Sequence, residues 1–334
     1  MNKTNIEWTT FSANPLKYRR KSDGQVVWAC VKTSPGCANC YSEAITLRFV
    51  RGKLFNAKNM EELEPFLDEA ELHKMATSKT IGGIQVSGSR CFVGDMTDLF
   101  GEWVPDGLLD QLFAVFALRP DVTWQVLTKR AKRMEEYMRR DVQMECTKII
   151  GQRICEAYER KHGNTLAMTA DRGALVNTWP LPNVWLGVSV EDQKRADERI
   201  PHLLRVPSAV RFLSMEPLLE DVDLTEWIRG PELPDIDPGC RDLDWVIIGG
   251  ESGKGARPLN INWIRSLVKQ CKAASVPVFV KQLGAKPYCE VALSREPCST
   301  DTFDQPLKLR DSHGGDMAEW SEDLRIREMP EVRS

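Results

Sequence analysis

The sequence predicts an α/β protein built as a full or partial parallel β/α barrel, similar to a TIM barrel. Three observations lead to this fold class: short apolar strands, amphipathic helices between them, and a length that suits one core. The chain has 334 residues, and barrels of roughly 250 residues fold around a single core. We therefore expect one barrel domain over residues 1–284, an insertion at about 145–182, and a loop-rich extension over 285–334 packed on the same domain.

Buried strands are predicted where β-branched and aromatic residues cluster between turn formers. Near-continuous apolar strands are typical of parallel sheets that are covered on both faces. A further short strand is expected around Val26–Ala29. The six main segments are Cys91–Met96, Thr123–Thr128, Val184–Val190, Val210–Met215, Trp245–Ile248 and Pro277–Lys281.

Amphipathic helices are expected between these strands. Asp106–Leu118 and Asn262–Ala274 each place their large apolar side chains on one stripe. A helix over Cys146–Lys161 is expected inside the insertion, and residues 285–334 show no convincing strand. Strands that alternate with helices indicate right-handed crossovers and a parallel sheet.

The charge balance argues against a chain that coats nucleic acid or membranes with its whole surface. It has 45 Lys and Arg against 48 Asp and Glu, a net charge of −3. Any polyanion would need a local patch, and the candidates are Lys17–Lys21 and the basic residues within 129–133. No apolar run approaches the roughly 20 residues that span a bilayer, and the start lacks a signal-peptide pattern. We expect a cytoplasmic protein without a membrane partner.

Polar residues follow the predicted strands at corresponding positions. Glu191 and Glu216 each come two residues after a serine at a strand end, and Glu251 follows Gly249 in the same way. In β/α barrels the carboxyl ends of the strands carry the active site, so these side chains are expected to share one cavity. The alternative is that each Glu caps a helix or pairs with a Lys. Three other strands end in Asp95, Lys129 and Lys281.

A glycine-rich stretch, Gly249–Gly255, follows one of these strands. It does not match a phosphate-binding P-loop, because the spacing is wrong and Lys254 is followed by Gly255 rather than Ser or Thr. Gly249 and Gly250 would still let a cofactor approach the backbone closely. A simple tight turn is the alternative.

Three cysteines near the N-terminus carry the most specific signal. Cys37 and Cys40 are separated by two residues in a turn that contains Pro35, and Cys30 lies seven positions before Cys37. The ten cysteines of the chain are expected to stay reduced in a cytosol, so this cluster points to metal. Three thiolates suit a 4Fe-4S cluster with one open iron, whereas structural zinc takes four closed ligands.

Two alternatives for the cysteines remain open at this point. His73 and Cys91 could complete a zinc site through the fold, or the thiols could be unligated.

Several segments resemble the phage gene-product thirty-seven/sixty-eight family, also described as three-Cys-motif proteins. That family is distantly similar to radical S-adenosylmethionine enzymes, although the first cysteine interval is wider here than their usual three residues. The resemblance runs from Asn5 to about Gly284 and includes His313–Trp320. The matching segments are NIEW, SPGCANCY, CFVGDMTDLF, QVLTKR, VWLGVSVEDQ, VRFLSMEPLL, DWVIIGGESGKGARP, VFVKQLG and HGGDMAEW.

The resemblance implies a radical enzyme of phage or prophage type in a bacterial host. The cluster would be bound by Cys30, Cys37 and Cys40, and its open iron would bind S-adenosylmethionine. The substrate is expected to be a nucleotide or nucleic acid, and a partner protein is expected to help select it. The implied cofactor-binding residues are Tyr41, Asp95, Glu191, Gly249, Gly250 and Glu251, and the implied catalytic residues are Lys129, Glu216 and Lys281.

Two other functions fit the same residues. A zinc- or cluster-containing protein could bind nucleic acid through the cysteine loop and the neighbouring run Lys17–Lys21. A barrel hydrolase could bind a divalent metal ion through the strand-end carboxylates. Its ligands would be Asp95, Glu191, Glu216 and Glu251.

Overall fold

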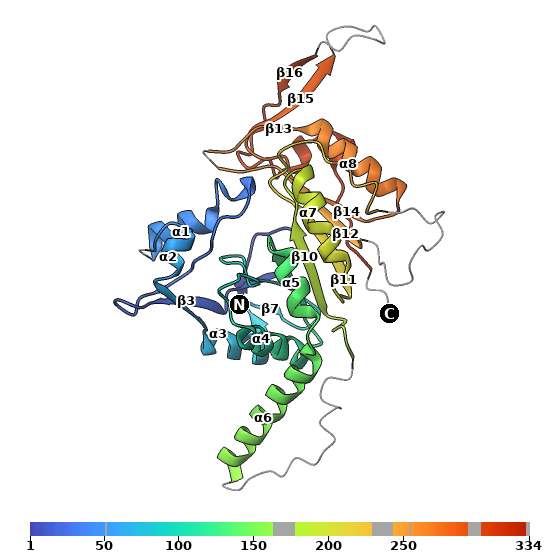
Figure 1. Cartoon of the computed structure of the whole chain (residues 1–334). Coiled ribbons are helices and arrows are strands. Elements are labelled where there is room, and N and C mark those ends of the chain that lie inside the picture. Colours follow the sequence, from blue (N-terminus) through green and yellow to red (C-terminus); the bar gives the residue numbers. More distant parts are fainter. Residues whose placement is uncertain (51, 163–177, 229–242, 254, 293–301, 332–334) are drawn as a thin grey trace.

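A computed structural model describes residues 1–50, 52–162, 178–228, 243–253, 255–292 and 302–331. These residues form a mixed α/β fold around one large, mostly parallel sheet (Figure 1). No described helix is both long enough and apolar enough to cross a membrane.

The central sheet has eight strands in the order β1-β2-β8-β9-β10-β11-β12-β14. Edge strand β1 pairs antiparallel with β2, and every other neighbouring pair is parallel. The carboxyl ends of seven strands therefore lie along one edge. The strands are β1 Asn2–Lys3, β2 Phe11–Ala13, β8 Arg90–Val93, β9 Thr123–Thr128, β10 Val184–Ser189, β11 Val210–Met215, β12 Trp245–Gly249 and β14 Val278–Gln282.

Helices cover the outer face of this sheet and bury the main apolar core with it. The stripe predicted for α4 is buried: Leu109, Leu112, Phe113 and Phe116 are all at most 2% exposed. Helix α4 packs against α6, and α5 packs against α7. The helices of this layer are α4 Asp106–Leu118, α5 Ala131–Met138, α6 Val142–His162, α7 Gln193–Leu204 and α8 Ile261–Ala273.

Aromatic side chains gather on the other face of the sheet. Trp8, from the segment before β2, lies 4.9 Å from Phe92 and 6.2 Å from Trp245, measured between ring centroids. Phe212 and Phe279 lie 5.8 and 6.0 Å from Trp245. Strands that are separated in the sheet order therefore share one apolar cluster on this face.

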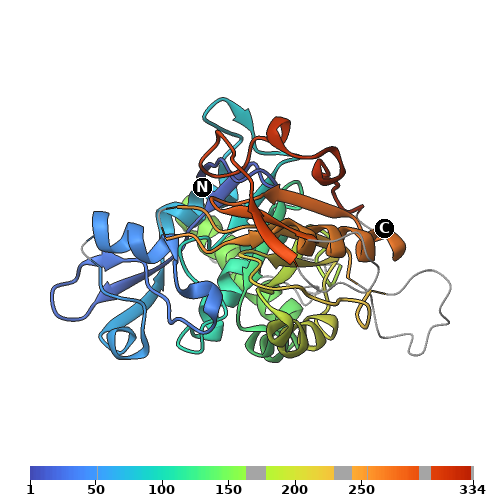
Figure 2. The ribbon, with the colours of Figure 1, turned by 90° about the horizontal axis from the view of Figure 1, so that it is seen from above.

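The N-terminal segment adds a smaller antiparallel sheet of β4, β3 and β5, with short helices and a two-stranded hairpin. In Figure 2 this blue segment projects from one side of the molecule. Its elements are β3 Leu16–Arg20, β4 Val26–Val27, the 3-10 turn η1 Pro35–Cys37, α1 Tyr41–Phe49, α2 Ala57–Met60, β5 Leu63–Leu67, α3 Glu69–Thr77, β6 Thr80–Ile81 and β7 Ile84–Gln85.

Several predictions of strands and helices are confirmed. The ranges Thr123–Thr128 and Val210–Met215 match β9 and β11 residue for residue, and the other main strands differ by a few residues at their ends. The helix of the insertion begins at Val142, four residues earlier than expected. The loop expected after that helix lies mostly outside the described residues.

Two expectations about topology need correction. A closed barrel is not shown, because in the described part of the chain the edge strands β1 and β14 are not paired with each other. The strand expected around Val26–Ala29 exists as β4, but it pairs with β3 in the small sheet. The first parallel strand of the central sheet is β2, whose three residues give no clear periodic pattern.

The expectation that residues 285–334 lack strands is wrong. Two strands there pair antiparallel with each other, and one of them also pairs with a short strand after β12. The backbone N–H of Val280 in β14 donates to the carbonyl oxygen of Ile326 at 2.8 Å. The elements of this part are β13 Leu259–Asn260, β15 Pro287–Ala292, β16 Thr302–Pro306, and the 3-10 turns η3 Met317–Glu319 and η4 Glu322–Leu324.

Candidate functional site

The loop that contains the three cysteines lies against the end of strand β10. The hydroxyl of Ser34 donates a hydrogen bond to Glu191 Oε1 at 2.8 Å. Gly36 lies so close that a Cβ at this position would come within 2.5 Å of the Glu191 side chain. Since Cys37 is the last residue of the turn that contains Gly36, Glu191 directly supports the backbone beside a cysteine.

Glu191 is fully buried, and two cations neutralise it. Lys129 Nζ lies 2.5 Å from Oε1, and an Arg199 guanidinium nitrogen lies 3.0 Å from Oε2. Burial alone would raise the pKa of Glu191, but Lys129 and Arg199 outweigh that effect and hold the pKa below its ordinary value. The carboxylate therefore stays charged, and it links β9, α7 and the cysteine loop.

A second carboxylate supports the other side of the loop. Glu251, at the end of β12, accepts a hydrogen bond from Asn39 Nδ2 at 3.0 Å. Arg257 binds both oxygens of Glu251 and also donates to the carbonyl oxygen of Pro35 at 3.0 Å. Burial raises the pKa of Glu251, whereas the stronger opposing effect of Arg257 and Asn39 lowers it overall.

The start of α1 contacts the end of β8. The Tyr41 hydroxyl donates to the backbone oxygen of Asp95 at 2.6 Å, and the Asp95 carboxylate accepts from Asn14 Nδ2 at 2.5 Å. Burial raises the pKa of Asp95. Tyr41 follows Cys40, so a third strand end is joined to the cysteine loop.

The remaining predicted residues form a pair at the ends of β11 and β14. Lys281 Nζ lies 3.1 Å from Glu216 Oε1. Burial opposes the charge of Lys281, yet Glu216 and Glu7 outweigh it and raise the pKa of that ammonium group. A Cβ at Gly249 would come within 2.4 Å of Glu216.

Position 250 requires glycine, because the backbone at Leu283 passes very close to it. A Cβ there would come within 2.6 Å of the carbonyl oxygen of Leu283. In the glycine-rich stretch a positive φ occurs at Gly253, with a value of +91°. Gly249 and Gly250 therefore provide room for neighbouring strand ends rather than a left-handed turn.

The predicted strand-end residues thus connect to the cysteine loop or to one another. Asp95, Glu191 and Glu251 contact residues of the loop or its flank, and Glu191 also holds Lys129. Each of the three glutamates forms an ion pair, as the alternative interpretation expected. However, these ion pairs also connect different elements of the site to one another. Glu191 in particular does not pair with a cation on the protein surface, because it is 0% exposed.

The three cysteines belong to one short segment. Cys30 follows β4, Cys37 ends the 3-10 turn, and Cys40 is the N-cap of α1. Burial raises the pKa of Cys30 to about 12 and also raises that of Cys40. A negative charge on Cys37 would add to both increases.

The donor set fits an iron–sulfur cluster in chemical type, because three free thiols come from one loop. The positions of the three thiols fit a cluster less well than their chemical type does. In the parts of the chain with described structure, no group of three His, Cys, Asp or Glu side chains is placed to hold one metal ion. A cluster would have to draw the three thiols together.

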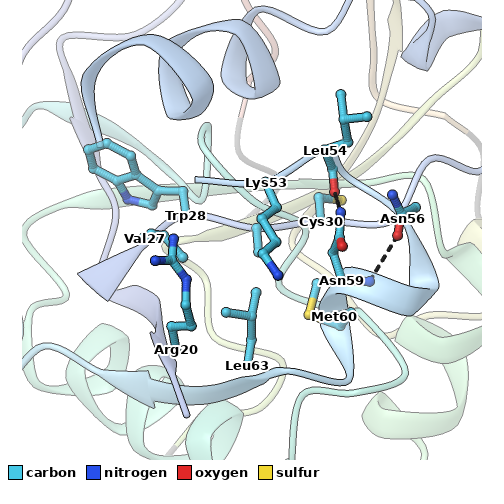
Figure 3. A pocket seen from close by; sticks show the side chains of 11 residues that line it. Arg20, Val27, Trp28, Cys30, Lys53, Leu54, Asn56, Asn59, Met60 and Leu63 are labelled. Atoms are coloured by element: carbon cyan, nitrogen blue, oxygen red, sulfur yellow. Dashed lines mark hydrogen bonds between the residues drawn. The ribbon is translucent and has the colours of Figure 1, made fainter. Parts of the chain in front are cut away.

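A pocket lies beside Cys30, between the small sheet and α2 (Figure 3). The pocket is narrow, with room for about one water molecule. Lys53 points into its centre, and Arg20 and Trp28 form one side. The pocket therefore places Trp28 beside Cys30, together with Arg20 and Lys53, which are paired with Asp23 and Glu62.

The two basic runs singled out from the sequence are mostly neutralised. Lys17 pairs with Asp68 and Arg20 pairs with Asp23. In the second run the partners of Arg130, Lys132 and Arg133 are Glu102, Glu136 and Asp106.

Four residues of the site were not expected from the sequence. Arg257 lies six positions after Glu251, and Arg199 lies eight positions after Glu191. These spacings predict a contact only when the turn and the helix between the residues are already known. Ser34 and Asn39 lie between the cysteines and contact residues more than 150 positions away. No local pattern marks such contacts.

One comparison with known proteins gives a match. A family model described as "Protein of unknown function (DUF5131)" matches residues 3–310. No curated protein and no solved structure matches the chain.

Proposed function

The chain belongs to the DUF5131 family, and from this premise and the docked cysteine loop we propose that it is an iron–sulfur, S-adenosylmethionine-dependent radical enzyme. We further propose kinship with the phage gene-product thirty-seven/sixty-eight family, on the segments quoted above. The substrate would be a nucleotide or nucleic acid, selected with the help of a partner protein.

One observation carries the proposal: the cysteine loop is held over the carboxyl ends of parallel strands. Ser34 bonds to Glu191 and Asn39 bonds to Glu251, so two strand ends support the loop from two sides. In parallel α/β folds this edge of the sheet is where cofactors and substrates bind. Three thiols at this edge would face the place where the chemistry occurs.

The shared aromatic cluster supports a partial barrel as the finer description of the fold. A flat sheet would keep the inward side chains of β8 and β12 four strand spacings, or roughly 19 Å, apart. Trp8 nevertheless lies within 6.2 Å of rings from both strands. A sheet that curves around Trp8 accounts for this contact.

Cys30, Cys37 and Cys40 would hold the cluster through thiolates. With S-adenosylmethionine bound, the chemistry supplied is one-electron cleavage of the sulfonium and abstraction of hydrogen from a substrate. The protein would orient the cofactor and exclude water. Tyr41 would flank the adenine, and Gly249 and Gly250 would keep the edge open for it.

Strand-end charges would complete the binding site. Lys129 or Lys281 would neutralise the carboxylate of the cofactor, and each is held now by a glutamate. Asp95, Glu191 and Glu251 would orient ribose hydroxyls directly or through the groups they hold. Glu216, beside Lys281, would face the substrate.

Iron analysis tests the ligand assignment. Protein purified without oxygen should contain about four irons per chain, and Cys37→Ala should lose most of them. Cys271→Ala is the matched control, because Cys271 is buried in α8 away from the loop. Full iron retention in Cys37→Ala, or its loss in Cys271→Ala, would contradict the assignment.

The same preparation separates the other two functions. Colourless protein with about one zinc per chain would favour the nucleic-acid-binding zinc protein. Hydrolysis that appears only with magnesium or manganese would favour the divalent-metal hydrolase, with its carboxylate ligands Asp95, Glu191, Glu216 and Glu251.

A further inference from the structure

Cys30 lies in a segment without regular structure, between β4 and the 3-10 turn η1. Cys37 ends that turn and Cys40 is the N-cap of α1, so both belong to local structure. The wide first interval therefore separates Cys30 from the elements that fix the other two cysteines. Its position has to come from contacts with distant parts of the chain.

Two side chains hold the backbone on either side of Cys30. The Thr97 hydroxyl donates to the carbonyl oxygen of Ala29 at 2.6 Å. The Arg130 guanidinium donates to the carbonyl oxygen of Val31 at 3.0 Å. The Cys30 thiol contacts the same oxygen of Val31 at 3.7 Å, so the guanidinium and the sulfur share one acceptor. Thr97 and Arg130 follow β8 and β9, which are neighbours in the central sheet.

Further contacts connect these two side chains to each other. Trp103 Nε1 donates to the Tyr18 hydroxyl at 2.8 Å, and that hydroxyl lies 3.2 Å from Thr97 Oγ1. A hydroxyl has one hydrogen, and that of Thr97 goes to the backbone, so Tyr18 donates to Thr97. The Arg130 guanidinium lies over the Trp103 ring, 4.5 Å from its centroid. The contacts thus form a closed path that begins at the residue before Cys30 and ends at the residue after it.

The hydroxyl groups of this path are buried and attached to the central sheet. Tyr18 is 0% exposed and Thr97 is 8% exposed. Asp98, next to Thr97, accepts from the Thr128 hydroxyl at 2.6 Å and from the Lys129 N–H at 3.0 Å. These bonds join the segment after β8 to the end of β9. A buried chain in which every hydroxyl is paired holds its members in one arrangement.

We propose that Tyr18, Thr97, Trp103 and Arg130, here named the Cys30 support, are positioning residues that fix Cys30 before any cofactor binds. A metal ligand that is already in place loses little freedom on binding, and residues that hold ligands in this way raise metal affinity. Packing of the core alone does not require contacts with the carbonyl groups on both sides of one cysteine. The use of Cys30 as a cluster ligand rests on the proposed function.

Alkylation by iodoacetamide tests the proposal on the reduced, metal-free chain, with the peptide of each cysteine followed by mass spectrometry. Thr97→Val removes the hydroxyl and leaves the charges around the Cys30 thiol unchanged. Loss of this buried hydrogen bond should raise the alkylation rate of Cys30 about 5-fold, because the segment opens more often. Thr97→Ser keeps a hydroxyl and should restore the wild-type rate. Trp103→Phe removes the first donor of the path at a half-buried position, and it should raise the rate by a smaller factor.

Two other cysteines are the internal controls. Cys37 should keep its rate in every variant, because the Cys30 support does not hold it. Cys271 is 0% exposed in α8 and should react only when the whole fold opens. Equal alkylation of Cys30 in the wild type and Thr97→Val, or a failure of Thr97→Ser to restore the rate, would overturn the proposal. So would a rise at Cys271 that matches the rise at Cys30 in both Thr97→Val and Trp103→Phe.

Iron content, measured separately after anaerobic purification, connects this result to the proposed function. Thr97→Val should retain less iron than Thr97→Ser, and equal iron in the two would overturn the step from a fixed Cys30 to cluster binding. A wild type that binds no iron would contradict the proposed function instead. The alkylation assay contains no metal, so its outcome on the position of Cys30 is independent of that result.

Discussion

Ser34 and Glu191 are 157 positions apart in the chain, yet a hydrogen bond of 2.8 Å joins the hydroxyl of one to the carboxylate of the other. This bond attaches the cysteine loop to the end of β10. Lys129 and Arg199 hold the same carboxylate in place. The position of the loop therefore depends on a buried, charged group that cannot move freely.

Gly36→Ala should detach the loop from this carboxylate. The added methyl group would come within 2.5 Å of the Glu191 side chain, which its two ion pairs keep from moving aside. We expect lower iron content per chain after anaerobic purification and faster proteolysis of the loop.

Gly107→Ala is the control for that change. A Cβ at Gly107, in α4, meets nothing within 4 Å, so this variant should match or slightly exceed the wild type in stability. If Gly36→Ala behaves like Gly107→Ala, Glu191 does not position the cysteine loop.

Gln125→Met should stabilise the fold. Gln125 is 0% exposed, and in the described residues neither polar atom of its side chain has a hydrogen-bond partner. An unsatisfied buried polar group costs about 1–3 kcal/mol, and methionine has a similar shape without that cost. The urea midpoint of unfolding should therefore rise.

Gln270→Met provides the opposite case. Gln270 accepts from the Leu224 N–H at 2.6 Å and donates to the carbonyl oxygen of Val222 at 3.0 Å, so its loss should lower the midpoint. A lowered midpoint for Gln125→Met would contradict the prediction and show that the Gln125 side chain contributes to stability.

Much of the central sheet could be predicted from the sequence. There are physical reasons why other strands could not be predicted. β9 and β11 consist of β-branched, aromatic and other apolar residues at most positions and are covered on both faces, so their limits are sharp in the sequence. β2 has three residues, too few for a periodic pattern. β15 and β16 lie in a separate small sheet, and each contains a proline and an acidic residue, which weakens the strand signal in their sequences.

The positions of the strand-end site residues could be predicted from the sequence, but the residues that they contact could not. Glu191 and Glu251 could be predicted as site residues because each follows a predicted strand, and all strands of a parallel sheet have their carboxyl ends at one edge. The partners Ser34 and Asn39 lie in a loop whose path depends on tertiary contacts. Sequence spacing carries no information about such contacts.

Acid should remove one stabilising contact between helices α5 and α7. The Arg205 guanidinium, together with His202, lowers the pKa of Glu135 to about 2. Because the folded-state pKa lies below the ordinary value of 4.5, the contribution is complete above that value and is lost as the pH falls toward 2. Glu135→Gln should thus be less stable than the wild type at neutral pH.

Urea unfolding at neutral pH and at a pH of about 3 measures this difference. The gap between wild type and Glu135→Gln should shrink in acid. Glu136→Gln should show no gap at either pH, because Glu136 is exposed and 3.9 Å from Lys132. A gap that stays constant would show that the Glu135 charge does not stabilise the fold.

The most direct test of the central claim is cleavage of S-adenosylmethionine by the reduced protein. The reconstituted chain is reduced with dithionite under anaerobic conditions, and 5′-deoxyadenosine and methionine are measured by chromatography, with Cys37→Ala as the control. We predict equal amounts of both products from the wild type and none from Cys37→Ala. An iron-loaded, correctly folded wild type that leaves S-adenosylmethionine intact would contradict the proposed radical chemistry.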